Sequence, residues 1–195
     1  MAVAASYPKL IRKLHITGVG ANRTPMAKLI LKSWTDTLRT TKQQNHLNEC
    51  NSMLTESALV PFAWSSIMLT YSPSFLSKNE KRVPLWVQSI SKQNTVQGIL
   101  AILEQTHTED ENNEWHPISM AKRIVLGDSI QELQMAVGSL DCMATVEETH
   151  KLSQLFTLKG SNSDCAVHVY DGCGHAVMME DARKWRSDLL TFLDN

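Results

Sequence analysis

The chain has 195 residues and a formal net charge of −1, and no stretch of it gathers lysines and arginines together. Hydrophobic residues make up 43% of the chain and charged residues 20%, which is typical of a globular protein. These values argue against nucleic acid or an anionic membrane surface as the main partner. No apolar run approaches the ~20 residues that a membrane-spanning helix requires, so no membrane span is expected.

The cysteine pattern and the N-terminus bear on the compartment. No C-x-x-C pair joins the four cysteines, which are Cys50, Cys142, Cys165 and Cys173. Reduced thiols are therefore favoured over the alternatives, a disulfide or a metal site. The first eight residues are too short for a signal peptide and are interrupted by Pro8. We expect a cytoplasmic protein.

The first part of the chain predicts a short helix followed by a strand. Residues 1–7 are rich in alanine and end at Pro8, which suits the end of a helix. Residues 13–19 then read as a buried strand. Gly18 and Gly20 suit the exit from that strand.

Residues 21–117 predict a mostly helical segment. Its first helix has apolar residues on one face, namely Ala27, Ile30, Leu31 and Trp34. Helical patterns follow over residues 51–69 and 83–103, with a break at residues 72–74 and with Pro84 near a helix start. We interpret the segment as a lid over a pocket; the alternative is a packed subdomain without that role.

The last part of the chain alternates between strands and helices. Residues 133–137 and 165–170 predict strands, and residues 146–156 predict a helix between them. A final helix is indicated by apolar residues three and four apart, namely Ala182, Trp185, Leu189 and Phe192. Strands and helices in this order predict a parallel sheet with right-handed crossovers.

Two polar residues follow the predicted strands at the point where parallel sheets carry their functional groups. Asp141 lies four residues beyond Val137, and His175 lies five beyond Tyr170. Adjacent strands stand ~4.8 Å apart, so the two loops could bring a carboxylate and an imidazole together. The carboxylate would fix the ring tautomer, and the other ring nitrogen could act as a general base. The alternative is a polar contact without catalysis.

The remaining histidines predict no site. His15 and His168 alternate with apolar strand residues and are expected to be sheet residues. His107 and His116 flank an acidic stretch without the spacing of metal ligands. No metal site is expected.

Three motifs, in this order, resemble the α/β-hydrolase superfamily. The segment Ala4–Ile16 resembles the helix and strand that follow that family's nucleophile. Gly138-Ser-Leu-Asp141 resembles its acid turn, and Gly172-Cys-Gly-His175, with Glu180 after it, resembles its histidine turn. The order of acid before histidine also matches the family.

The resemblance implies an α/β fold: the C-terminal part of an α/β-hydrolase parallel sheet, with flanking helices and a helical cap insertion. Residues 1–20 and 118–195 would form the truncated hydrolase core, and residues 21–117 the cap or lid. The strand at residues 13–19 would then have one bare edge, open to a partner chain. Such a three-stranded remnant is expected to be marginally stable in isolation.

The family's nucleophile is missing from the sequence. No G-x-S-x-G occurs anywhere in the chain. The segments at Gly138-Ser139 and Gly160-Ser161 lack the second glycine and the strand-to-helix setting. Cys142 and Cys173 adjoin the two candidate residues and are alternative thiol nucleophiles, although neither lies on such a turn. The oxyanion hole of the family is expected to be absent as well.

The resemblance implies a serine hydrolase acting on a carboxylic ester or a related acyl bond, with Asp141 orienting His175 and His175 acting as base and acid. Because the nucleophile is absent, we expect a truncated form with little or no activity by itself. The alternatives are a non-catalytic ligand- or protein-binding member of the fold and a nonfunctional truncated product. The expected partner is a small-molecule acyl substrate or ligand. No cofactor is implied.

Overall fold

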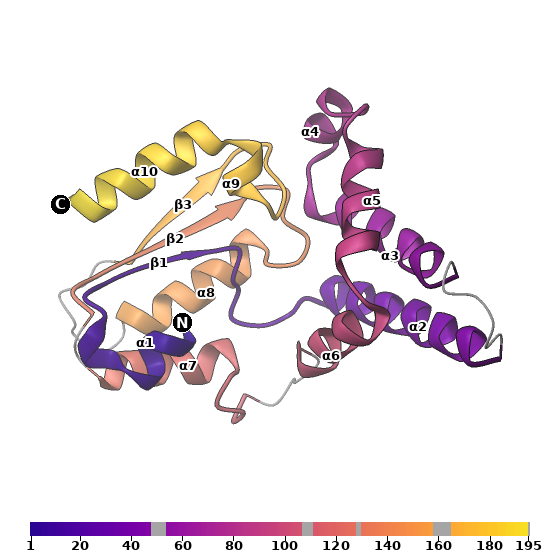
Figure 1. Ribbon diagram of the computed structural model, residues 1–195. Helices are drawn as coiled ribbons and strands as arrows, with labels where there is room; N and C mark the ends of the chain where they lie inside the picture. The colour runs from indigo at the N-terminus through magenta and orange to yellow at the C-terminus, as the bar shows by residue number, and fades with distance from the viewer. Residues whose placement is uncertain (48–53, 107–110, 128–129, 158–164, 195) are drawn as a thin grey trace. The chain divides into compact units, whose positions relative to one another are not determined.

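The structure is a computed structural model that describes residues 1–47, 54–106, 111–127, 130–157 and 165–194 (Figure 1). The chain divides into two compact units, one made of residues 1–24 and 109–195 and the other of residues 25–108. The first unit contains the sheet, and the second is helical in its described part. Among the described helices, none has both the length and the apolar character needed to cross a bilayer.

The first unit is built on a three-stranded parallel sheet in the order β1-β2-β3. The strands are β1 (Lys13–Thr17), β2 (Glu132–Gly138) and β3 (Cys165–Tyr170). The predicted strands and their parallel arrangement are confirmed. The predicted end of the first strand is wrong by two residues, because Gly18 has a φ of +66° and leaves the extended conformation at Thr17.

One face of the sheet is covered by α1 (Ala2–Ser6), α7 (Pro117–Leu126) and α8 (Val146–Thr157) (Figure 1). Their apolar side chains form the main core together with the strands; its buried members include Ala4, Ile16, Ala121, Ile124, Leu133, Met135, Leu152 and Phe156. This core confirms the predicted helix over residues 146–156, whose spacing turns Leu152 and Phe156 toward the sheet.

Helix α7 was not predicted. Pro117 stands in its first turn, where proline needs no hydrogen-bond partner for its nitrogen. His116 is the N-cap, and its Nδ1 accepts the N–H of Ile118 at 3.3 Å. Pro117 therefore begins a helix, whereas the sequence interpretation placed it at the end of the helical segment.

The opposite face of the sheet is covered by α10 (Ala182–Asp194), which follows the short helix α9 (Val177–Glu180) (Figure 1). Lys13 Nζ donates to the Phe192 carbonyl at 3.0 Å, and Trp185 Nε1 donates to Thr17 Oγ1 at 3.2 Å. The sheet thus presents an apolar face to α7 and α8 and a largely polar face to α10.

The helical unit comprises α2 (Pro25–Leu47), α3 (Leu54–Thr70), α4 (Pro73–Lys78), α5 (Val83–Gln93) and α6 (Val96–Thr106). The predicted apolar face of its first helix is confirmed at Ala27, Ile30 and Leu31, which are buried, whereas Trp34 is only half-buried. Leu38, which was not predicted, is buried on the same helix. A second cluster within the unit joins α3 to α5 through Ala63, Ile67, Val83 and Val87.

Two details of the helical prediction are corrected. The pattern over residues 83–103 was interpreted as continuous, but α5 ends at Gln93 and α6 begins at Val96. Thr95 Oγ1 accepts the N–H of Gly98 at 3.0 Å, which caps the new helix. The break at residues 72–74 also starts a helix, because Ser72 Oγ accepts the Phe75 N–H at 3.3 Å.

Candidate active site

Asp141 lies in the turn that follows β2, and its side chain is fully buried. Oδ1 accepts the backbone N–H groups of Met143 at 2.8 Å and Ala144 at 2.9 Å. The Asp141 N–H donates to the Gly138 carbonyl at 3.1 Å, which closes the turn. A buried carboxylate needs such donors, and these leave Oδ2 directed at a further partner.

That partner is His175, from the turn after β3. Its Nδ1 lies 2.8 Å from Asp141 Oδ2. The hydrogen bond to Asp141 raises the pKa of His175, although burial of the ring acts in the opposite direction. Because Asp141 accepts the proton on Nδ1, the lone pair of the neutral ring lies on Nε2. The side chain of His175 remains 37% exposed, so a reacting group has access to it.

Backbone hydrogen bonds join the acid turn to the histidine turn. Ser139 N–H donates to the Tyr170 carbonyl at 2.9 Å, and Leu140 N–H donates to the Cys173 carbonyl at 2.9 Å. Ser139 Oγ accepts the Gly172 N–H at 2.8 Å. The Gly174 N–H donates to Glu180 Oε1 at 2.8 Å. The two turns therefore hold the carboxylate and the imidazole in one frame.

Two glycines allow this close approach. A Cβ atom on Gly138 would collide with the backbone oxygens of Cys173 and Gly174, so only glycine fits where the histidine turn crosses the end of β2. Gly172 has a φ of +69°, in the left-handed region that favours glycine.

The imidazole of His175 reaches beyond β2 to the end of β1. A Cβ atom built on Gly18 would lie 3.0 Å from Cε1 and 3.3 Å from Nδ1 of the ring. The pair therefore lies at the carboxyl ends of the strands, as parallel sheets predict. Sequence reasoning identified Gly18 only as a strand exit and missed this contact.

The structure does not support Cys142 or Cys173 as a nucleophile. Burial, assisted by the charge of Asp141, raises the pKa of Cys142, and burial together with nearby acidic groups raises the pKa of Cys173. Burial also raises the pKa of Cys165 to about 12. All three are free cysteines in protonated form, whereas a nucleophile must be a thiolate. Cys50 lies outside the described residues.

The other sequence candidates are also located. The hydroxyl of Ser139 donates to Asp171 Oδ1 at 3.3 Å and accepts from Gly172, so it serves the turn. Gly160-Ser161 and His107 lie outside the described residues. Where side chains are described, no group of three or more histidines, cysteines, aspartates and glutamates is arranged to hold a metal.

Comparison with known proteins gives matches in structure alone. No family model matches the sequence, and no curated protein matches it. An α/β-hydrolase enzyme from a Medee basin deep-sea metagenome library is similar at a TM-score of 0.72 and 20% sequence identity. The match covers 100% of this chain and 60% of that enzyme's chain. The enol-lactonase from Burkholderia xenovorans is similar at a TM-score of 0.70 and 13% identity, with the same coverage.

A bromoperoxidase from Bacillus anthracis is similar at a TM-score of 0.65 and 13% identity, over 100% of this chain and 64% of its own. The chain thus spans about three fifths of the length of these structures. At such identities the likeness concerns the fold. The chain has the α/β-hydrolase fold and corresponds to the C-terminal portion of it.

Proposed function

We propose that Asp141 and His175 are the acid and the base of a serine-hydrolase site that cleaves carboxylic esters or related acyl bonds. The observation that carries this proposal is the 2.8 Å hydrogen bond from His175 Nδ1 to a fully buried carboxylate. A surface ion pair has no need of such burial, whereas a catalytic imidazole needs a fixed tautomer and a raised basicity.

In the proposed reaction, His175 Nε2 takes the proton of a nucleophilic hydroxyl as that oxygen attacks the acyl carbon. The imidazolium, stabilised by Asp141, then gives the proton to the departing alkoxide and leaves an acyl-enzyme. Water repeats the sequence: Nε2 takes its proton, and the nucleophile oxygen recovers it when the acid is released. Every proton that moves passes through one ring nitrogen.

The 195 residues contain no G-x-S-x-G and therefore lack the nucleophile elbow of serine hydrolases with this fold. We therefore propose that the chain has little or no hydrolase activity by itself, and that the active form includes a strand and elbow supplied by another polypeptide segment. The coverage of three fifths of the similar structures supports this, since those hydrolases hold further chain.

The edge of β1 is the proposed entry point for that segment. β1 pairs with β2 on one side, and Arg12 and Gly18 direct their hydrogen-bonding groups to β2. The alternation of a parallel strand turns the groups of Lys13, His15 and Thr17 the other way. A strand added there in parallel would end beside Gly18, against which the His175 ring packs.

We further propose that the helical unit, residues 25–108, is the cap that shapes an acyl-binding pocket. Small-molecule pockets are lined mainly by apolar and aromatic side chains. Tyr71, Phe75 and Trp86 cluster within this unit, with ring centroids 5.1–6.1 Å apart. The similar structures include an enol-lactonase and a bromoperoxidase, so the fold by itself selects no single acyl group.

A chimera tests the proposal. An N-terminal segment that contains a strand and a G-x-S-x-G elbow, taken from an active serine hydrolase of this fold, would be fused ahead of Met1. We expect hydrolysis of p-nitrophenyl butyrate that falls by a factor of about 10³ or more in His175→Ala and Asp141→Asn. The unfused chain should show the same low rate with and without His175→Ala. A folded chimera whose rate of hydrolysis is unchanged by both substitutions would refute the proposal.

A further inference from the structure

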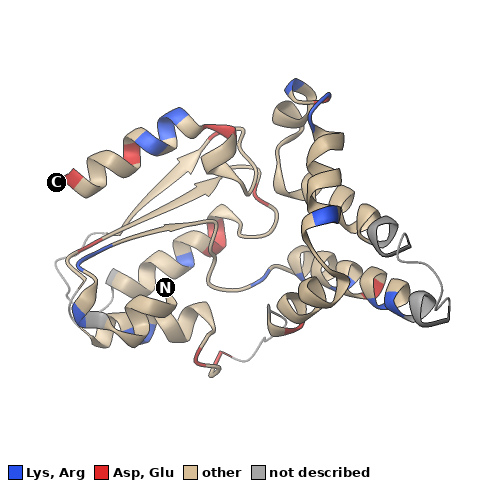
Figure 2. Cartoon of the chain, viewed as in Figure 1, with Lys and Arg blue, Asp and Glu red and all other residues tan. Residues whose placement is uncertain are grey.

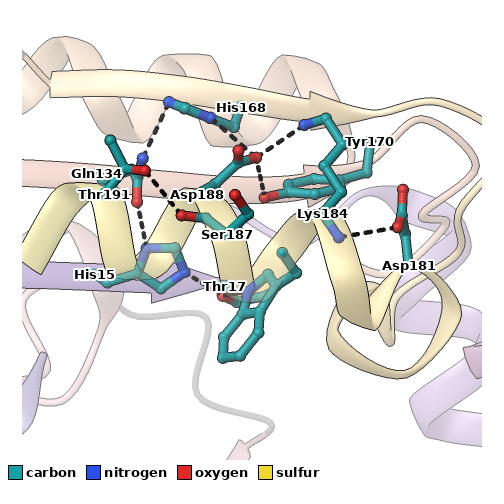
Figure 3. Close-up of polar contacts among 11 residues, drawn as sticks. His15, Thr17, Gln134, His168, Tyr170, Asp181, Lys184, Ser187, Asp188 and Thr191 are labelled. Carbon is teal, nitrogen blue, oxygen red and sulfur yellow. Dashed lines mark hydrogen bonds and ion pairs between the residues drawn. The ribbon is translucent and has the colours of Figure 1, made fainter.

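Two histidines on the polar face of the sheet are bridged by a single amide (Figure 3). His15 on β1 and His168 on β3 flank Gln134 on β2, which is 5% exposed. Gln134 Oε1 lies 2.9 Å from His15 Nδ1, and Gln134 Nε2 lies 3.0 Å from His168 Nε2. Both histidines were predicted to be strand residues, but no contact between them was predicted.

The amide fixes the protons on both rings. Its oxygen can only accept, so His15 carries a proton on Nδ1. Its NH₂ group can only donate, so His168 carries none on Nε2. In this arrangement His168 is neutral, with its proton on Nδ1, and His15 is free to be neutral or charged.

Helix α10 completes the cluster on the His168 side. His168 Nδ1 lies 3.5 Å from Asp188 Oδ2, to which Tyr170 Oη donates at 2.7 Å and Lys184 Nζ at 2.8 Å (Figure 3). Burial opposes ionisation of Asp188, but the hydrogen bonds from Lys184 and Tyr170 outweigh it and hold its pKa below the usual value. An anion therefore faces His168.

On the His15 side the partners are neutral. Thr17 Oγ1 lies 2.9 Å from His15 Nε2 and accepts the Trp185 indole N–H at 3.2 Å. The ring also contacts Trp185 and Phe192, with centroids 5.7 Å and 6.3 Å away. A hydroxyl can accept from Nε2 or donate to it, so Thr17 suits either tautomer of His15.

We infer that Gln134 is a two-position toggle that allows only one of the two histidines to carry a positive charge. A second proton on His168 would place its Nε2–H against the amide NH₂ group. The amide must then rotate by half a turn and offer its oxygen to His168 and its NH₂ group to His15. His15 must in that case give up the proton on Nδ1 and hold its single proton on Nε2, toward Thr17.

The charged groups around the two histidines differ. Asp188 faces His168, with Lys184 and Asp181 further along on the α10 side. Lys13 shares the strand of His15 and is paired with Glu132 at 3.2 Å. Burial, and the proximity of His168, lower the pKa of His15. A charged His168 would therefore face the Asp188 carboxylate and require the rotated amide and a neutral His15, whereas a charged His15 fits the amide as it stands.

Nitrogen NMR of the histidine rings in the full chain tests the toggle. The ¹⁵N shifts of both rings would be followed from about pH 8 to about pH 5, the range in which imidazoles titrate. Where His168 is charged, we expect His15 Nδ1 to be unprotonated and its Nε2 protonated; where His15 is charged, we expect His168 Nε2 to be unprotonated. The second of the two rings should become charged only about one pH unit or more below the first, because that step breaks an amide hydrogen bond.

Gln134→Glu is the decisive variant, since a carboxylate of the same shape accepts from both rings at once. Both histidines should then become charged together, and both midpoints should rise. Gln131→Glu adds the same charge at an exposed position just before β2. It should shift the titration midpoint of neither histidine by more than a few tenths of a pH unit. The toggle is refuted if His15 keeps its Nδ1 proton while His168 charges, or if the two glutamate variants give the same midpoints.

Discussion

Replacing Gly18 with alanine would press a methyl group against the imidazole of His175. The new Cβ would lie 3.0 Å from His175 Cε1 and 3.3 Å from Nδ1, closer than normal packing allows. The ring must retreat by a few tenths of an ångström, which stretches its 2.8 Å bond to Asp141. A charge-assisted hydrogen bond contributes about 1.5–3 kcal/mol, so losing half of it lowers the pKa of His175 by about 0.5–1 unit.

The chain offers a matched control in Gly172. Both glycines have left-handed backbones, with φ of +66° at Gly18 and +69° at Gly172, so alanine at either costs about 1–2 kcal/mol of backbone strain. A Cβ on Gly172, however, meets nothing within 4 Å. Proton NMR of the ring Cε1–H gives the pKa, and urea unfolding gives the stability. The reasoning fails if Gly18→Ala leaves the His175 pKa unchanged, or if Gly172→Ala lowers it equally.

Three further predictions follow from other contacts. Gly138→Ala collides with the backbone of Cys173 and should lower the free energy of unfolding by about 2–4 kcal/mol, against about 1 kcal/mol for Ser139→Ala, as urea titration would show. Because Asp141 raises the pKa of His175 above its usual 6.5, the pair's contribution to stability is full below that pH and is lost as pH rises through the folded value; Asp141→Asn should abolish this dependence. In the helical unit, Leu38→Ala should cost about 2–5 kcal/mol, while the same change at exposed Leu29 should stay within about 0.5 kcal/mol.

The sheet was predictable because its strands are short apolar runs between turn residues. β2 lies in the run around Leu133 and Val137, and its burial on both faces leaves one structural option. Helix α7 was missed because Pro117 can equally end or begin a helix, and the N-cap at His116 is not one of the usual capping residues. The break between α5 and α6 was missed because the apolar periodicity continues across Asn94 and Thr95.

The polar sites likewise include one that the sequence predicts and two contacts that it does not predict. Asp141 and His175 could be found because each follows a strand in a local motif, and parallel strands end at one edge. The contact of Gly18 with the His175 ring depends on how far the histidine turn reaches across the sheet, which no local pattern encodes. The Gln134 bridge depends on the exact register of three strands, in which Gln134 pairs with His15 on one side and Ala166 on the other.

The hydrogen bonds between the turn of Asp141 and the turn of His175 make this pair insensitive to changes elsewhere in the chain. The hydrogen bonds that set Asp141 and His175 arise within residues 138–180. The N-terminal residues contribute the surface at Gly18 on which the ring rests. Sequence changes outside these two turns would therefore leave the contact between Asp141 and His175 assembled. Under the function proposed above, hydrolysis could be lost and regained by exchanging only the segment that carries the nucleophile, because the acid and the base are held together independently of it.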